Sequence, residues 1–268
     1  MKLRPVAGIV LRQVYLMRGS FVRFFPLIAW VLIDILLWGF LTRYLNSVAG
    51  RGVDFVPQLL GAALLWDFLS RVMLGVTVAF LEDVWSRNLL NFFATPLTIP
   101  EYLCGMVATG VGTSLIGLAA MLALAVLVFG LSFFPLGVFL AHAMLVLLIF
   151  GVVLGVLACA IVLRWGPAAE WLTWPIPALL TPFAGVFYPV TTLPAWMQAV
   201  AAALPPSYVF EALRSRLAGA AAPAQGHLLG AEALTLAYLL AAGFVFLRVF
   251  RKVVRNGMLA RYSAESPG

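Results

Sequence analysis

The feature that most constrains this chain is a series of apolar stretches, each long enough to cross a lipid bilayer as a helix. A hydrocarbon core of about 30 Å needs about 20 apolar residues in helical form. The stretches lie at residues 24–45, 56–81, 101–129, 134–163, 171–190 and 228–250. Only 10% of the 268 residues are charged, whereas a soluble domain carries about 25%. We therefore expect an all-α, polytopic integral membrane protein with six transmembrane helices in one transmembrane domain.

Basic residues flank these stretches unevenly, and this predicts the orientation of the chain. A six-span topology places on one side Lys2, Arg4, Arg12, Arg18, Arg23, Arg87, Arg164, Arg248, Arg251, Lys252, Arg255 and Arg261. The other side receives Arg43, Arg51, Arg214 and Arg216. Because cytoplasmic loops are enriched in Lys and Arg, we expect both termini in the cytoplasm. The net charge of +7 then indicates contact with the lipid bilayer surface and not with nucleic acid. The alanine- and arginine-rich composition suits a bacterial plasma (inner) membrane.

Two segments at the predicted cytoplasmic face are amphipathic and too short to cross. Residues 1–22 alternate apolar and basic side chains at helical spacing, which predicts an interfacial helix. Residues 82–97 carry charged and aromatic side chains at helical spacing, and Pro96 and Pro100 stop the helix. A short cytoplasmic helix is expected there. Its aromatic side chains would be costly to leave in water, so they need lipid headgroups or a protein partner.

The segment 193–217 is apolar but broken by proline. Pro194 precedes its first half, and the pair Pro205 and Pro206 precedes the second. Each half is too short to cross, and backbone at membrane depth is tolerated only where it is helical or buried in protein. We expect a re-entrant helical pair that enters from the outer side, with Trp196 and Tyr208 in the aromatic belt.

The chain lacks the motifs of an ATPase or a metalloenzyme. Neither Lys2 nor Lys252 belongs to a glycine-rich phosphate loop. The two histidines, His142 and His227, are far apart in the sequence and have no carboxylate-rich neighbours, which argues against a metal site. We expect no catalytic residue, no metal and no cofactor in this chain, and no enzymatic activity of its own.

Three charged residues lie inside the predicted spans. Asp67 and Arg71 are four residues apart on one helix face and can pair, whereas Asp34 needs a partner on a neighbouring helix. A charge at the bilayer centre costs about 2.5 to 3.5 kcal/mol on insertion scales, so such residues face the bundle interior or water. The sequence is equally consistent with Asp67 and Arg71 as a purely structural ion pair and as part of the lining of a polar path.

These segments together resemble the permease subunits of exporter-type ABC transporters, the type 2 family that includes polysaccharide, nodulation-factor and drug exporters. The matching stretches are 85–97, 180–194, 204–208 and 211–214. The resemblance covers essentially the whole chain.

The resemblance implies a homodimer, or a pseudo-symmetric pair, bound to two copies of a separate ABC ATPase subunit that holds ATP and Mg. It implies that residues 82–97 form the coupling helix to that ATPase. The expected contact residues are Glu82, Asp83, Trp85, Arg87, Asn88, Phe92 and Phe93. The expected path or dimer seam includes Asp34, Asp67 and Arg71. The expected outer gate includes Pro194, Trp196, Pro205, Pro206 and Tyr208.

The expected function is ATP-driven export of an amphipathic substrate such as a drug, a lipid or a polysaccharide. An alternative is a proton-coupled secondary transporter that uses Asp34 and Asp67 as relay groups. Broken helices in both halves of the chain would support that alternative, but the sequence shows a break only in the second half. A third hypothesis is a membrane scaffold, against which the charged pair Asp67 and Arg71 argues mildly.

Overall fold

The computed structural model describes residues 3–19, 21–49, 56–93, 95–130, 136–218 and 223–257. Their regular structure is helical, as the all-α prediction requires. The α-helices are α1 (Leu3–Arg18), α2 (Phe21–Ala49), α3 (Gly61–Trp85), α4 (Leu89–Phe93), α5 (Ile99–Phe129), α6 (Gly137–Trp165), α7 (Ile176–Ala184), α8 (Ala195–Ala202), α9 (Pro205–Leu217) and α10 (Pro223–Arg255). Three short helices of other types are η1 (Val56–Leu60), η3 (Pro167–Leu172) and η4 (Val190–Thr192).

Five of these segments are long and apolar enough to cross a membrane, within the residues that the structure describes. They are Ile28–Val48, Gln58–Trp85, Ile99–Phe129, Gly137–Trp165 and Leu228–Arg255. They correspond to the first four predicted spans and to the sixth. The chain is therefore a multi-pass membrane protein.

The predicted fifth span, residues 171–190, is not a single long helix. The 3-10 helix η3 ends at Leu172, and α7 has only 9 residues, which reach about 14 Å at 1.5 Å per residue. The prolines of this region are Pro175, Pro177, Pro182 and Pro189. Because proline supplies no N–H to the helical ladder, the helix is short and interrupted. The structure thus corrects the prediction of one membrane-crossing helix here to a shorter, proline-broken one.

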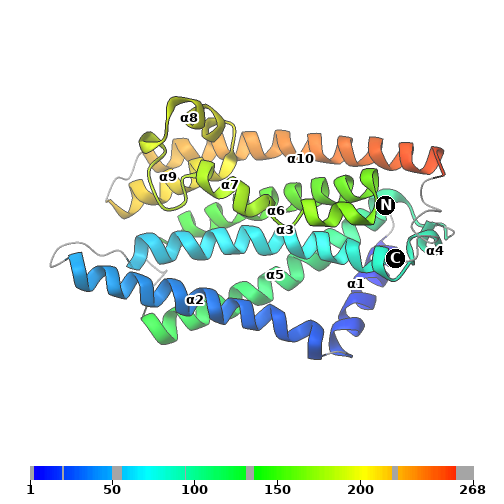
Figure 1. Cartoon of the computed structure of the whole chain (residues 1–268), viewed down its shortest axis with the longest axis horizontal. Helices are drawn as coiled ribbons and strands as arrows, with labels where there is room; N and C mark the ends of the chain where they lie inside the picture. The colour runs from blue at the N-terminus through cyan, green and yellow to red at the C-terminus, as the bar shows by residue number, and fades with distance from the viewer. Residues whose placement is uncertain are drawn as a thin grey trace.

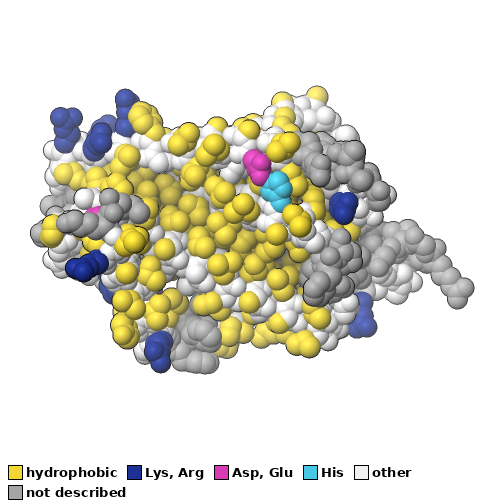
Figure 2. Space-filling model, turned by 180° about the vertical axis from the view of Figure 1, so that it is seen from behind, with side chains coloured by type: hydrophobic (Ala, Val, Ile, Leu, Met, Phe, Trp, Pro, Cys, Tyr) yellow, Lys and Arg dark blue, Asp and Glu magenta, His cyan; other side chains and the backbone are white. Residues whose placement is uncertain are grey.

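The long helices run side by side along the longest axis of the molecule (Figure 1). Helix α3 lies in the centre and packs against α5 and α6, while α10 packs against α6 and α9, and α2 packs against α5. Helices α1 and α4 lie at one end with the last turn of α10, and α8 and α9 lie at the other (Figure 1). Lys and Arg side chains gather at the first of these ends on the face shown in Figure 2, and the band between the ends is mostly hydrophobic. We call the two ends the basic end and the far end.

Glycines allow the central helix to approach its neighbours closely. A Cβ added to Gly75 of α3 would lie 2.9 Å from the carbonyl oxygen of Gly110 in α5. On the α6 side, a Cβ on Gly151 would lie 2.8 Å from the carbonyl oxygen of Leu69, and one on Gly155 would lie 2.7 Å from Cβ of Val76. The sequence pair Gly151 and Gly155 is therefore a helix-packing motif, as its spacing predicts.

The N-terminal segment forms a helix, α1, that is docked onto the bundle. It packs against α5 and α2. Ile9 is buried, and a Cβ added to Gly105 of α5 would lie 2.8 Å from the Ile9 side chain. Leu3, Leu11 and Tyr15 are exposed on α1 and are suited to contact with lipid. Movement of α1 therefore cannot occur without a change at its contact with α5.

Candidate functional site

The three charged residues inside the bundle form one ionic cluster. Arg71 Nε donates to Asp67 Oδ2 at 2.5 Å on the same helix, and Arg71 Nη2 lies 3.4 Å from Asp34 Oδ2 of α2. The neighbouring helix thus supplies the partner that Asp34 was expected to need. We call Asp34, Asp67 and Arg71 the charged triad. With two carboxylates and one guanidinium it has one negative charge in excess when all three are ionised.

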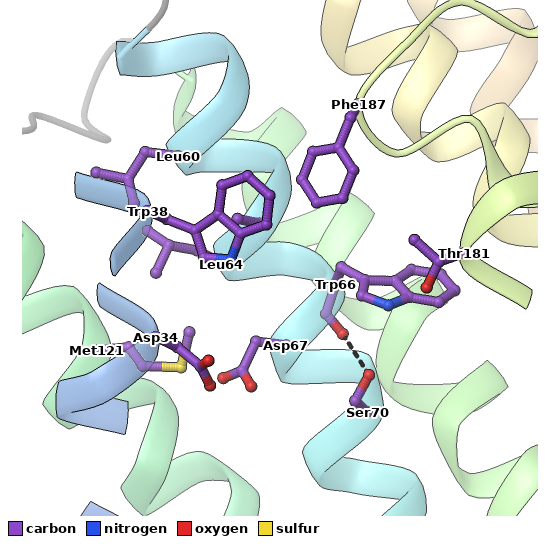
Figure 3. Close-up of a pocket in the computed structure, with 11 residues that line it drawn as sticks. Asp34, Trp38, Leu60, Leu64, Trp66, Asp67, Ser70, Met121, Thr181 and Phe187 are labelled. Atoms are coloured by element: carbon purple, nitrogen blue, oxygen red, sulfur yellow. Dashed lines mark hydrogen bonds between the residues drawn. The ribbon is translucent and has the colours of Figure 1, made fainter. Parts of the chain in front are cut away.

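A cavity of about 270 Å³ lies on the far-end side of the triad, and we call it the acidic cavity. The carboxyl groups of Asp34 and Asp67 both line it and point toward each other at close range (Figure 3). Three aromatic side chains, Trp38, Trp66 and Phe187, form much of the remaining lining. The rings of Trp38 and Phe187 stack with centroids 4.5 Å apart and an interplanar angle of 17°. This stack joins α2 to the segment that follows α7.

A larger cavity of about 740 Å³ lies between α1, α2, α3 and α5, and we call it the basic-end cavity. Its lining includes Arg71 and continues along α3 to Glu82 and Trp85, with Gln13 of α1 and Trp30 of α2 also exposed to it. Arg71 lines the basic-end cavity, whereas its two carboxylate partners line the acidic cavity. The charged triad therefore stands between the two cavities.

At the basic end, Asp83 is the centre of a polar cluster that joins four helices. Its carboxylate pairs with Arg12 of α1 and accepts a hydrogen bond of 2.7 Å from the Tyr102 hydroxyl of α5. The Arg12 guanidinium lies over the Phe92 ring of α4, 4.8 Å from its centroid. The side chain of Asp83 is only 1% exposed. A carboxylate so buried serves these internal partners, and its expected contact with a partner protein stays a prediction.

The segment 82–97, which was predicted to form one short helix, is divided between the end of α3 and the short helix α4. Helix α3 continues to Trp85, so Glu82 and Asp83 belong to its last turn, and α4 covers only Leu89–Phe93. The two helices meet at Arg87, whose φ of 56° is in the left-handed region. The helix end is closed by two backbone hydrogen bonds, from Arg87 N to Val84 O and from Asn88 N to Asp83 O, both 3.0 Å. This is a Schellman motif with arginine where glycine is usual.

The other predicted contact residues differ in exposure. Trp85 is 52% exposed, and its Nε1 donates to Glu170 Oε2 of η3 at 2.7 Å. Arg87 is exposed, Asn88 is half-buried, and Phe92 is half-buried against Tyr102. The side chain of Phe93 lies outside the described part of the chain. Trp85 and Arg87 are therefore the predicted residues best placed to meet a partner. The sequence did not single out Glu170, because an isolated acid in a loop carries no pattern.

At the far end, α8 and α9 form two short helices joined at Leu204. Pro194 is the N-cap of α8, and Pro205 and Pro206 occupy the first positions of α9. The Tyr208 hydroxyl donates to Ala202 O at 2.8 Å, which satisfies a carbonyl at the end of α8. Trp196 is 64% exposed and meets Phe183 of α7 edge-to-face. Hydrogen bonds thus hold the two short helices to each other.

The ion pair between Glu211 and Arg214 fixes the loop between α7 and α8. The Glu211 carboxylate accepts hydrogen bonds from Val190 N at 2.7 Å and from Arg214 Nη2 at 2.8 Å. Arg214 Nη1 also donates to Gly185 O at 2.7 Å. Because α9 holds the loop that carries Phe187, the far end and the wall of the acidic cavity form one connected unit.

One ion pair lies on the outer surface of the bundle, away from both cavities. His142 of α6 pairs with Glu232 of α10, and Figure 2 shows a histidine and an acidic side chain in contact within the hydrophobic band. Neither residue lines the acidic or the basic-end cavity. Glu232 is therefore a suitable control acid for experiments on the cavities.

Comparison with known proteins adds one finding. A protein-family model described as "ABC-2 type transporter" matches residues 11–217, which extend from within α1 to the end of α9. The matched region contains the charged triad, the lining residues of both cavities and the polar cluster around Asp83. A search of curated proteins found no match.

Proposed function

The chain belongs to the ABC-2 type transporter family, and on that premise we propose that it is the permease subunit of an ATP-driven exporter. Permeases of this family normally pair with a separate ABC ATPase subunit. The observation that carries the proposal is the pair of cavities, which are lined by successive stretches of α3, with the charged triad contributing residues to both. Ionisable residues inside a membrane domain that face a cavity are typical of a substrate path.

The basic end is proposed to face the cytoplasm. Arg12 and Arg18 of α1, Arg164 of α6 and Arg255 of α10 lie there, whereas Arg43, Arg214 and Arg216 are the basic residues at the far end of the described chain. This asymmetry agrees with the excess of Lys and Arg in cytoplasmic loops. The basic-end cavity would then take up substrate, and the acidic cavity would lead toward the outer gate at α8 and α9.

The polar cluster around Asp83 supports a route by which an ATPase could act on the bundle. The proposed docking surface is the exposed turn after α3, with Trp85, Arg87 and Asn88, together with α4. A displacement of α4 would reach α1 through the contact of Phe92 with Arg12, and α3 and α5 through Asp83 and Tyr102. The same displacement would reach η3 through the bond from Trp85 to Glu170. Closure of the ATPase would in this way change the packing around the basic-end cavity.

A second copy of this chain is proposed to complete the path. Helix α2 leaves exposed the side chains Trp30, Ile33, Leu37, Phe40 and Tyr44. Their spacing of three and four residues places them on one face of the helix, in the pattern of a helix–helix seam. A homodimer that pairs these faces would bring the two acidic cavities toward each other, because Asp34 and Trp38 lie on the same helix.

The test is to solubilise the tagged chain gently from its native membrane and to identify what co-purifies with it in stoichiometric amount. The proposal requires a chain with a phosphate loop whose ATP hydrolysis depends on this protein. Recovery of the chain alone, together with transport that collapses when the proton gradient is dissipated, would contradict the proposal and favour the secondary transporter. That alternative would make Asp34 and Asp67 the residues to replace next.

A further inference from the structure

We propose that the acidic cavity is a binding site for an organic cation, and that the exported substrate carries a quaternary or substituted ammonium group. This inference rests on the proposed export function and adds the substrate class to it. The family assignment leaves that class open, since it describes a transporter without naming its cargo. The inference depends on the charge of the cavity, on its aromatic wall and on its position beside a guanidinium that a ligand could replace.

The charge of the cavity favours a cation. Asp34 and Asp67 both line it, and Arg71 is the basic residue that neutralises them. Arg71 is held at 2.5 Å by Asp67 but lies 3.4 Å from Asp34, so Asp34 is the less completely neutralised carboxylate. Where water is excluded, a carboxylate that is only partly neutralised attracts a cation more strongly than it does in water.

The wall of the cavity provides the second requirement. Trp38, Trp66 and Phe187 line it together with the two carboxylates, and Figure 3 shows the rings of Trp38 and Phe187 above the two carboxyl groups and the ring of Trp66 to their right. Aromatic faces attract ammonium groups through the ring quadrupole, and quaternary ammonium ligands are commonly held in this way. An anion would meet repulsion from both the carboxylates and the ring faces. The cavity therefore selects by the sign of the ligand charge as well as by its apolar surface.

The third argument is the position of the triad between the two cavities. The bond from Arg71 to Asp34 joins α3 to α2. A ligand cation that takes the place of Arg71 at Asp34 would keep that carboxylate neutralised while it breaks the ion pair between α2 and α3. Arg71 would remain paired with Asp67 on its own helix. Substrate binding and loss of the ion pair between the two helices are thereby linked through one exchange of partners at Asp34.

The experiment measures equilibrium binding of radiolabelled phenyltrimethylammonium to the purified chain in lipid nanodiscs. Benzenesulfonate, an anion of similar size, is the matched competitor. We expect saturable binding of phenyltrimethylammonium that benzenesulfonate does not displace. Asp34→Asn and Trp38→Leu should each weaken binding about tenfold, because each removes one of the two attractions. Glu232→Gln, which removes an acid outside the cavity, should bind like the wild type. All variants are compared as monodisperse fractions from size-exclusion chromatography.

Two results would overturn the inference. One is the absence of saturable binding to the wild-type chain, and the other is equal affinity of the wild type and of both cavity variants. Displacement by benzenesulfonate at equal concentration would overturn it as well. Because this assay contains no ATPase, a negative result leaves the export function standing. Failure of the chain to associate with an ATPase would instead contradict the export function and leave a measured cation site intact.

Discussion

At the residue scale, the backbone at Arg87 is held in a conformation that disfavours a side chain. A residue other than glycine in the left-handed region costs about 1 kcal/mol or more, and such residues often persist where a function needs them. Arg87 occupies this position in the turn proposed to meet the ATPase, with a φ of 56°. We infer that the side chain is retained for contact with the partner and at a cost to stability.

The corresponding prediction compares two replacements of Arg87. Arg87→Gly removes both the side chain and the backbone strain, so it should raise the melting temperature in detergent by about 2 °C. Arg87→Ala removes most of the side chain but keeps the backbone strain, so it should not raise the melting temperature. Differential scanning fluorimetry measures both. Equal melting temperatures for the two variants would show that the left-handed backbone stores no strain here.

The pairing of the charged residues inside the bundle was predictable from the sequence, whereas the role of Asp83 was not. The pairing of Asp67 with Arg71 followed from their spacing on one helix, and a partner for Asp34 on another helix followed from the cost of an isolated charge. The role of Asp83 could not be predicted, since an acid beside a proposed partner surface has the same sequence pattern whether it is exposed or buried. Arg12, which pairs with Asp83 in the folded structure, is 71 residues away in the sequence.

At the element scale, the close packing of α3 against α5 and α6 depends on glycines at the helix contacts. We predict that Gly155→Ala lowers the stability of the bundle by about 1 to 3 kcal/mol, because the new methyl group overlaps Val76 and the carbonyl of Met73. Gly112→Ala on α5 is the matched control, since a Cβ there would meet nothing within 4 Å. That variant should be neutral or more stable by up to about 1 kcal/mol, because alanine is the better helix former.

Thermal unfolding of the two variants in the same detergent tests this packing. A melting temperature of Gly155→Ala at or above that of Gly112→Ala would mean that α3 and α6 do not pack as closely as described. Neither glycine lines the acidic or the basic-end cavity, so the two substitutions place no new methyl group in either cavity.

The elements were predictable to different degrees for a physical reason. Five long apolar helices follow from length and hydropathy alone, and each observed bound differs from the predicted one by five residues or fewer. The segment 171–190 has the composition of a membrane span. A hydropathy average, however, does not register that proline lacks the backbone N–H group that a helix needs. The prolines of this segment interrupt the helical ladder, so composition and conformation disagree there. The short helices α8 and α9 were placed correctly in the sequence by prolines at their starts.

At the scale of the whole molecule, the exposed face of α2 predicts where two copies meet. Leu37→Cys should form a disulfide-linked dimer when the membranes are treated with a mild oxidant, because the same face of α2 in a second copy would lie opposite it. Leu240→Cys on α10 is the matched control, since Leu240 is also exposed and apolar but lies on a different helix. It should remain monomeric under the same treatment.

Both variants are made in a background without Cys104 and Cys159, the two native cysteines, and cross-linking is read on non-reducing gels. Cross-linking through Leu240→Cys and none through Leu37→Cys would place the interface on α10 and contradict the proposed path between two acidic cavities.

If the basic end faces the cytoplasm and carries the docking surface for an ATPase, cysteine accessibility will differ between the two ends of the bundle. In the cysteine-free background, Arg87→Cys and Trp196→Cys are labelled with a membrane-impermeant thiol reagent in vesicles of both orientations. We expect that Arg87→Cys reacts only in inside-out vesicles and is protected when the ATPase is bound, while Trp196→Cys reacts only in right-side-out vesicles without protection. Reaction of both cysteines from the same side, or labelling of Arg87→Cys unchanged by the ATPase, would contradict this orientation or this docking surface.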